Sequence, residues 1–237
     1  MTPDQALVEL NASTRRFLTR NRLTIEDRNQ FSSGSRSCSI ADFNDDALYP
    51  AATRAGRVLG RLRSHDAKGS FGIVAAPGGG SATALFGESA TYTNFRAKWL
   101  EMSGWHSADS ITKLGRLRLT RGDQEDLLFT IALTGCAVVV DSAPNGDLLV
   151  LHVRPSGGTL DTVGLLGDTR FTEMDGRQTQ TTLAKAGWNA VYGAKDYGRQ
   201  RKAIVVGAKR ADGWRLYAQE QDEDGNILKV KRIWPKE

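Results

Sequence analysis

The feature that most constrains this chain is a turn between two apolar runs that are rich in β-branched residues. Residues 127–141 are LLFTIALTGCAVVVD and residues 148–153 are LLVLHV, and the segment Ala143–Asp147, APNGD, lies between them. Proline followed by Asn-Gly favours a three-residue loop in which a type I turn precedes a glycine with positive φ. The pattern therefore predicts a β-hairpin that joins the two runs.

The predicted turn sets the register of the hairpin. If Ala143 faces Asp147, then Val138 faces His152, and Cys136 lies two residues further along the first strand. Side chains alternate between the faces of a strand, so Cys136 and His152 would be diagonal neighbours on one face. A four-residue loop would shift the register by one residue and turn His152 to the other face.

A thiol and an imidazole held in this way can form a nucleophile and its base. A cysteine attacks as the thiolate, and a nearby imidazole lowers its pKa. Gly135 leaves room for a substrate carbonyl, and backbone N–H groups around Gly135 and Cys136 could stabilise an oxyanion. A third group should orient His152, and Asp141, the Thr130 hydroxyl or carbonyl, and another backbone carbonyl are all open possibilities.

Length and composition set outer limits on the fold and on cofactors. The chain has 237 residues, a net charge of +5, two cysteines and three histidines. We expect a single domain over residues 1–237, with residues 1–40 as a helical N-terminal extension. The two cysteines form no disulfide framework, and the scattered histidines lack companion cysteines at ligand spacing, so we expect no metal and no cofactor. No apolar run is long enough for a membrane span, and the N-terminus shows no Sec signal.

The remaining patterns predict an α+β fold with a mainly antiparallel β-sandwich core flanked by helices. Predicted helices cover residues 3–20, 51–62, 91–102 and 181–192, and a serine-rich loop covers residues 32–39. Further strands are predicted over residues 71–76, 83–86, 114–120, 202–207, 214–219 and 226–234. Cys38 falls in the serine-rich segment, which makes it a poor catalytic residue.

Basic residues suggest an alternative of a different class, a non-catalytic binding module for RNA or an acidic protein. Arg54, Arg57 and Arg61 form a stripe on the second predicted helix, and Lys229–Arg232 is a basic run near the C-terminus. Lys and Arg are otherwise spread along the chain, which makes nucleic acid the less favoured partner.

The segment Leu133–Cys136, LTGC, followed by His152, resembles the Leu-Ser-Gly-Cys…His signature of the glutamine deamidase family that includes the cytotoxic necrotizing factor catalytic domain and Burkholderia lethal factor 1. The resemblance implies a bacterial toxin or effector that converts a glutamine of a host protein to glutamate. It implies Cys136 as nucleophile, His152 as proton carrier, and Thr130, six residues before the cysteine, as third member. Thr134 stands where the family commonly has serine, and the Cys–His interval differs.

The family also implies a partner and a location. The substrate would be a Rho-type GTPase or a translation initiation helicase, reached in the host cytoplasm after the bacterium secretes or injects the protein. We expect a monomer with Gly135 and Thr134 supporting the oxyanion through their backbone. A papain-like protease or a transglutaminase that uses the same Cys136–His152 pair is the enzymatic alternative.

Overall fold

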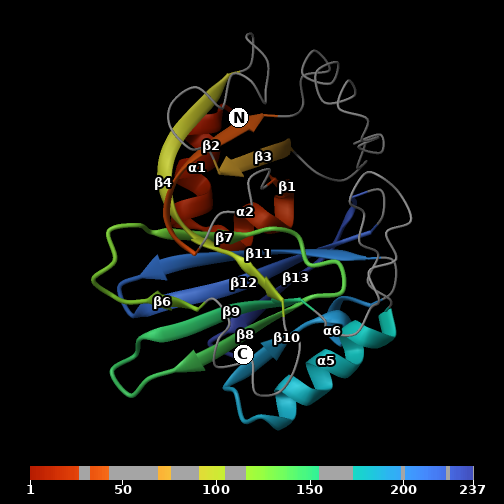
Figure 1. Ribbon diagram of the computed structural model, residues 1–237. Helices are drawn as coiled ribbons and strands as arrows, with labels where there is room; N and C mark the ends of the chain where they lie inside the picture. Colours follow the sequence, from red (N-terminus) through yellow and green to blue (C-terminus); the bar gives the residue numbers. More distant parts are fainter. Residues whose placement is uncertain are drawn as a thin grey trace.

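Strands dominate the described part of the protein. The computed structural model describes residues 1–26, 33–42, 69–75, 91–104, 116–154, 173–198, 201–222 and 225–236, and these ranges form two sheets and a few helices (Figure 1). This confirms the predicted α+β class. The larger sheet curves strongly, so the architecture is a large, nearly closed sheet rather than a clear two-layer sandwich.

The larger sheet has eight strands in the order β1-β3-β2-β4-β7-β11-β12-β13. Their bounds are β1 Asn21–Glu26, β3 Gly69–Ala75, β2 Gly34–Asp42, β4 Tyr92–Leu100, β7 Leu127–Thr130, β11 Lys202–Arg210, β12 Gly213–Gln221 and β13 Ile227–Trp234. Most neighbours are antiparallel, but β1 pairs with β3 and β4 pairs with β7 in parallel. The last three strands, β11, β12 and β13, form an antiparallel meander.

The smaller sheet carries the hairpin. Its strand order is β10-β8-β9-β5, and β6 pairs with β9 beside that path. The bounds are β10 Ala190–Tyr192, β8 Ala137–Ser142, β9 Leu148–Arg154, β5 Met102–Gly104 and β6 Leu117–Leu119. The predicted hairpin strands therefore become β8 and β9 at the centre of this sheet.

The helix predicted over residues 3–20 forms, but it breaks at Ser13. Helix α1 covers Pro3–Ala12 and helix α2 covers Thr14–Arg20. The Thr2 hydroxyl accepts the Gln5 N–H at 3.3 Å, and the Gln5 side chain accepts the Thr2 N–H at 3.0 Å. This reciprocal cap stabilises the first turn of α1.

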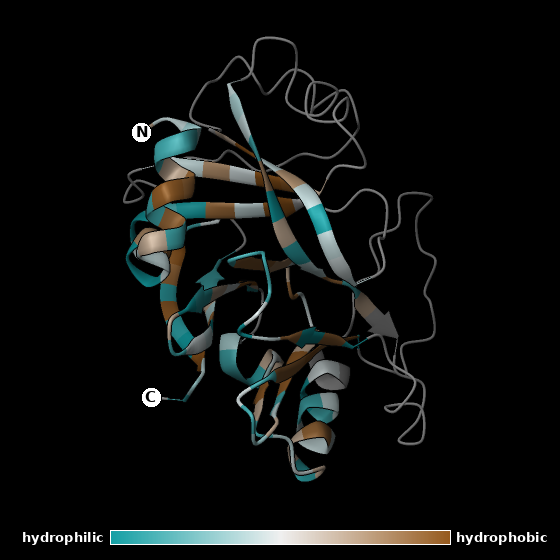
Figure 2. Cartoon of the chain, turned by 90° about the vertical axis from the view of Figure 1, so that its left-hand side faces the viewer, coloured by the Kyte–Doolittle hydropathy of each residue, from teal (hydrophilic) through white to brown (hydrophobic). Residues whose placement is uncertain are grey.

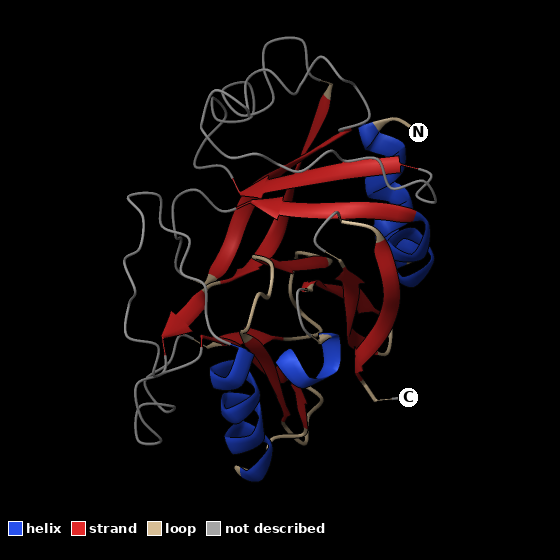
Figure 3. Ribbon diagram, turned by 90° about the vertical axis from the view of Figure 1, so that its right-hand side faces the viewer, coloured by secondary structure: helices blue, strands red, loops and turns tan. Residues whose placement is uncertain are grey.

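Three apolar clusters hold the layers together. One lies between the two sheets and contains Cys136, Val138 and Val150 from the hairpin. A second joins α1 and α2 to the eight-stranded sheet, and a third joins the outer face of β8 and β9 to helix α5, Glu173–Lys185. Figure 2 shows apolar bands recurring along the strands, and Figure 3 shows the N-terminal helices against the large sheet and α5 at the opposite end of the molecule.

The buried side-chain amides of Gln219 and Gln221 form hydrogen bonds that connect β12 to the end of α2 and to β1. The Gln219 amide nitrogen donates to the carbonyls of Leu18 and Asn21, and its oxygen accepts the Leu23 N–H at 3.0 Å. Gln221 donates to the Leu23 carbonyl at 2.8 Å. Both glutamine side chains are buried, so these bonds fix where α2 ends and β1 begins.

Two predicted elements are wrong. Residues 91–102 form no helix: β4 covers most of them, and Phe95, Ala97 and Trp99 point to one apolar cluster with a period of two. The described part of the loop predicted over residues 32–39 is mostly strand: β2 begins at Gly34, and its Cys38 and Ile40 are buried between β3 and β4. Pairing on both sides overrides the low strand propensity of the serines.

The other predictions divide into three groups. The strands expected over residues 71–76, 114–120, 202–207, 214–219 and 226–234 are confirmed with shifted ends. The weak helix expected over 181–192 lies earlier, as α5, and its last part is the strand β10. The helix over 51–62, with Arg54, Arg57 and Arg61, and the strand over 83–86 lie outside the described residues.

Candidate active site

The hairpin has the predicted turn and the predicted register. The Ala143 N–H donates to the Asp147 carbonyl, and the Gly146 N–H donates to the Ala143 carbonyl, both at 2.9 Å. Gly146 has φ of 83°, the positive value that the third loop residue requires. Val138 consequently faces His152, and Cys136 lies two residues before Val138 in the same apolar cluster.

Thr130 is the group that contacts the His152 ring. The Thr130 hydroxyl lies 2.5 Å from Nδ1 of His152 and donates its own hydrogen to the Leu100 carbonyl at 2.8 Å. Because that hydrogen is already used, the hydroxyl must accept from Nδ1–H. Thr130 thus fixes the tautomer and leaves Nε2 of His152 as an acceptor, which has no hydrogen-bond partner among the described residues.

The thiol of Cys136 contacts a different side chain. Its Sγ lies 3.6 Å from Sδ of Met102, and Met102 is the residue of β5 that pairs with His152. The described contacts include no hydrogen bond between the thiol and the imidazole. Cys136 and His152 therefore lie on one face of the sheet, as the sequence predicts. The thiol, however, donates its hydrogen bond to the thioether of Met102, which the sequence pattern did not indicate.

Burial keeps both groups neutral. Cys136 is 2% exposed and His152 is fully buried. Burial raises the pKa of the Cys136 thiol to about 12, against the smaller opposing effects of the Thr134 backbone N–H and the Arg154 charge. Burial lowers the pKa of His152 to about 3. In this conformation the pair is a thiol and a neutral imidazole rather than a thiolate and an imidazolium.

The Tyr197 hydroxyl forms hydrogen bonds with the backbone on both sides of the Gly135–Cys136 peptide bond. Its hydroxyl accepts the Gly135 N–H at 2.6 Å and donates to the Cys136 carbonyl at 3.0 Å. Tyr197 belongs to the short helix α6, Ala194–Tyr197, and is buried. The Gly135 N–H, which we expected to serve an oxyanion, is therefore already engaged, while the Thr134 side chain is exposed at the surface.

Helix α5 supports the same turn from the other side. A Cβ placed on Gly176 would lie 2.4 Å from the Gly135 carbonyl oxygen, closer than atoms approach. Gly135 itself has φ of 110°, a conformation that side chains disfavour. Sequence reasoning found Gly135 but missed Tyr197, Met102 and Gly176, because contacts at such sequence separation leave no local pattern.

The other predicted residues do not join this site. Asp141 pairs with Leu149 at the far end of β8, and Cys38 is buried in β2 within another apolar cluster. Among the described residues, no group of three or more His, Cys, Asp and Glu side chains is arranged to hold a metal ion. His65 and His106 lie outside the described residues.

Comparisons with known proteins add no assignment. No protein-family model matches the chain, and no curated protein matches it. Within the described ranges, no helix is both long and apolar enough to cross a membrane.

Proposed function

We propose that this protein hydrolyses a side-chain amide and converts a glutamine of a host protein to glutamate. The observation that carries the proposal is the 2.5 Å contact between Thr130 and Nδ1 of His152, which leaves Nε2 unpartnered among the described residues on the sheet face that also holds Cys136. Cys136 is the nucleophile, His152 carries the proton, and Thr130 positions the imidazole. The proposal includes the β-sandwich fold of the deamidase toxins.

The reaction follows from these roles. The Cys136 thiol passes its proton to Nε2 of His152, and the thiolate attacks the amide carbon. The tetrahedral intermediate expels ammonia, which takes the proton from Nε2, and a thioester forms. Water gives a proton to Nε2, attacks the thioester and releases glutamate, and the proton returns to the sulfur. One water is consumed and one ammonia is released in each cycle.

The described conformation is the resting form in this proposal. With a thiol pKa near 12, the thiolate is scarce at neutral pH, and burial excludes the substrate. Activation requires Sγ to leave Sδ of Met102 and turn to Nε2 of His152. In this proposal, substrate binding displaces Met102, and the freed thiol then pairs with the unpartnered Nε2 of His152.

The resemblance to the deamidase toxins supplies the remaining parts of the proposal. The partner is a Rho-type GTPase or a translation initiation helicase in the host cytoplasm, and the protein is a monomer that the bacterium secretes or injects. A protease or a transglutaminase would pass through the same acyl-enzyme chemistry. The products separate the three reactions, since proteolysis cuts the chain and transglutamination adds an amine.

The test uses the two cysteines as a matched pair. Purified protein is incubated with a host-cell lysate, and ammonia release and glutamine-to-glutamate conversion are measured by an enzymatic assay and by peptide mass spectrometry. Cys136→Ser should abolish both signals, whereas Cys38→Ser should retain them, because Cys38 is buried in β2 away from the hairpin. Equal conversion by the wild type and Cys136→Ser, or no conversion by the wild type, would reject the proposal.

A further inference from the structure

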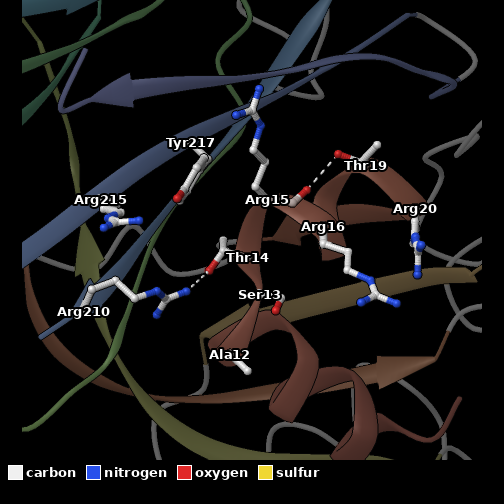
Figure 4. A pocket seen from close by; sticks show the side chains of 10 residues that line it. All are labelled: Ala12, Ser13, Thr14, Arg15, Arg16, Thr19, Arg20, Arg210, Arg215 and Tyr217. Atoms are coloured by element: carbon white, nitrogen blue, oxygen red, sulfur yellow. Dashed lines mark hydrogen bonds between the residues drawn. The ribbon is translucent and has the colours of Figure 1, made fainter. Parts of the chain in front are cut away.

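A basic cavity lies between the N-terminal helices and the eight-stranded sheet (Figure 4). Its volume is about 480 Å³, within the range of small-molecule sites. Five arginines line it. The other lining residues are Ala12, Tyr217 and three residues with hydroxyl side chains, Ser13, Thr14 and Thr19. The described lining residues are Ala12, Ser13, Thr14, Arg15, Arg16, Thr19, Arg20, Arg210, Arg215 and Tyr217.

No acidic residue is among the described residues that line this cavity. Arg215 pairs with Asp212 at 2.7 Å, and Arg16 lies 3.8 Å from Glu9, but both acids lie outside the lining. Burial lowers the pKa of Arg210, and the charge of Arg215 acts in the same direction, whereas Tyr217, Asp126 and Asp212 oppose it. Gathering like charges in this way is unfavourable unless an anion neutralises them.

Hydrogen bonds hold part of the cavity wall, around Arg210 and the end of α2, before any ligand arrives. Arg210 donates to the buried Thr14 hydroxyl at 2.8 Å and to the Lys209 carbonyl at 2.8 Å. On the helix side, Gln219 holds the end of α2 through the Leu18 carbonyl. The side chains that are already held lose less conformational entropy on binding than side chains that must be ordered.

Four of the five lining arginines form two groups, and the fifth, Arg15, points away from both in Figure 4. In Figure 4, Arg210 and Arg215 lie on the strand side of Ser13, whereas Arg16 and Arg20 extend together from α2 on the other side. Guanidinium groups match phosphate oxygens with paired hydrogen bonds, so two groups suit a ligand with at least two phosphates. Tyr217, the only aromatic residue in the described lining, is 6% exposed and offers little ring surface for stacking a base.

We propose that this cavity binds a compact anion that carries two or more phosphate groups, of the inositol polyphosphate type, either free or as a lipid headgroup. The site is separate from the thiol chemistry. Tyr217 faces the apolar cluster beneath α1 and α2, whereas its neighbour Leu216 faces the cluster that contains Cys136. The eight-stranded sheet therefore lies between the two sites, and the inference does not depend on the proposed function.

The test measures binding of myo-inositol hexakisphosphate to the full chain by calorimetry. Arg16→Gln/Arg20→Gln removes two exposed charges from the cavity, and Lys185→Gln/Lys229→Gln removes two exposed charges elsewhere. The arginine variant should bind about tenfold or more weakly and the lysine variant within about twofold of the wild type. Raising the salt concentration should weaken binding. Because all four side chains are exposed, both variants should fold.

Additional probes identify the source of the phosphates. Co-sedimentation with phosphatidylcholine vesicles, with and without phosphatidylinositol bisphosphate, tests the headgroup, and competition with the soluble probe shows whether both use this cavity. Binding of either probe that depends on Arg16 and Arg20 supports the proposal. Equal losses in the arginine and lysine variants, or an RNA oligonucleotide that binds when both phosphate probes fail, would overturn it.

Discussion

The hydroxyl of Thr130 lies 2.5 Å from Nδ1 of His152, although the two residues belong to different sheets. Thr130 ends β7 of the large sheet, and His152 lies in β9 of the small one. The bond therefore joins the sheets at the point where Cys136 also lies. The Leu100 carbonyl, which accepts from Thr130, makes the direction of the hydrogen bond unambiguous.

Removing the Thr130 hydroxyl should destabilise the fold and reduce activity. Thr130→Val keeps the shape but leaves Nδ1–H of His152 and the Leu100 carbonyl without their partner, and an unsatisfied buried polar group costs about 1–3 kcal/mol. Urea unfolding measures this loss. Thr130→Ser, which keeps the hydroxyl, should lose less stability and retain most of the ammonia release. Equal stability of the valine and serine variants would contradict the role assigned to the hydroxyl.

His152 should make stability depend on pH. Its folded pKa is about 3 and its ordinary value is 6.5, so below 6.5 the unfolded chain binds a proton that the folded chain does not. Stability is therefore fully present above 6.5 and falls as the pH decreases toward 3, by up to about 1.4 kcal/mol per pH unit. Glu125 and Asp147, whose pKa values are lowered, add their effects only near and below their ordinary values of 4.5 and 3.8.

The measurement is the free energy of unfolding between about pH 7 and about pH 5, where the carboxylates contribute little. The wild type should lose stability across this interval, and His152→Gln should lose less. Parallel curves for the two proteins would show that His152 is not held in its neutral form.

Met102 should control the reactivity of Cys136. Its Sδ lies 3.6 Å from the thiol, and both cysteines have a pKa raised to about 12 by burial, so native protein should react slowly with iodoacetamide at both. Met102→Ala should raise the alkylation rate of Cys136 and leave that of Cys38 unchanged. Peptide mass spectrometry over time provides both rates. A parallel rise at Cys38 would indicate general unfolding instead.

Tyr197 should affect activity through the backbone that it holds. Tyr197→Phe removes the hydroxyl that joins the Gly135 N–H to the Cys136 carbonyl, and we expect a loss of about 1–3 kcal/mol in stability together with slower ammonia release. Tyr192 is the matched control, because it is also buried, with its ring 6.0 Å from that of Tyr197, but its hydroxyl donates to Glu220. Tyr192→Phe should keep the ammonia release rate. Equal rates in both variants would exclude a positioning role.

Gly176→Ala should reverse the usual effect of this substitution in a helix. Replacing glycine by alanine in a helix normally stabilises it by about 1 kcal/mol. Here the added Cβ would lie 2.4 Å from the Gly135 carbonyl oxygen, so α5 or the turn must shift, and we expect a net loss of about 1–3 kcal/mol. Thr182→Ala, at an exposed position of α5, should not destabilise the protein comparably. Thermal unfolding of both variants tests the contact.

The sequence by itself determined the hairpin and its register. The turn needs only local chemistry, namely a proline, an asparagine and a glycine with positive φ, and the alternation of side chains then carries His152 and Cys136 to one face. Local patterns in the same way predicted the helix over residues 3–20 and the last three strands, with shifted ends.

Only the tertiary structure decided what those residues contact. Strand β4 looked helical and β2 looked like a loop, because their apolar residues become informative only when neighbouring strands cover them. Thr130 became the partner of His152 because packing brings β7 against β9, and the thiol faces Met102 because β5 pairs beside β9. The arginines near both ends of the chain meet in one cavity for the same reason. A sheet places side by side segments that lie far apart in the sequence, and no local pattern indicates which segments these are.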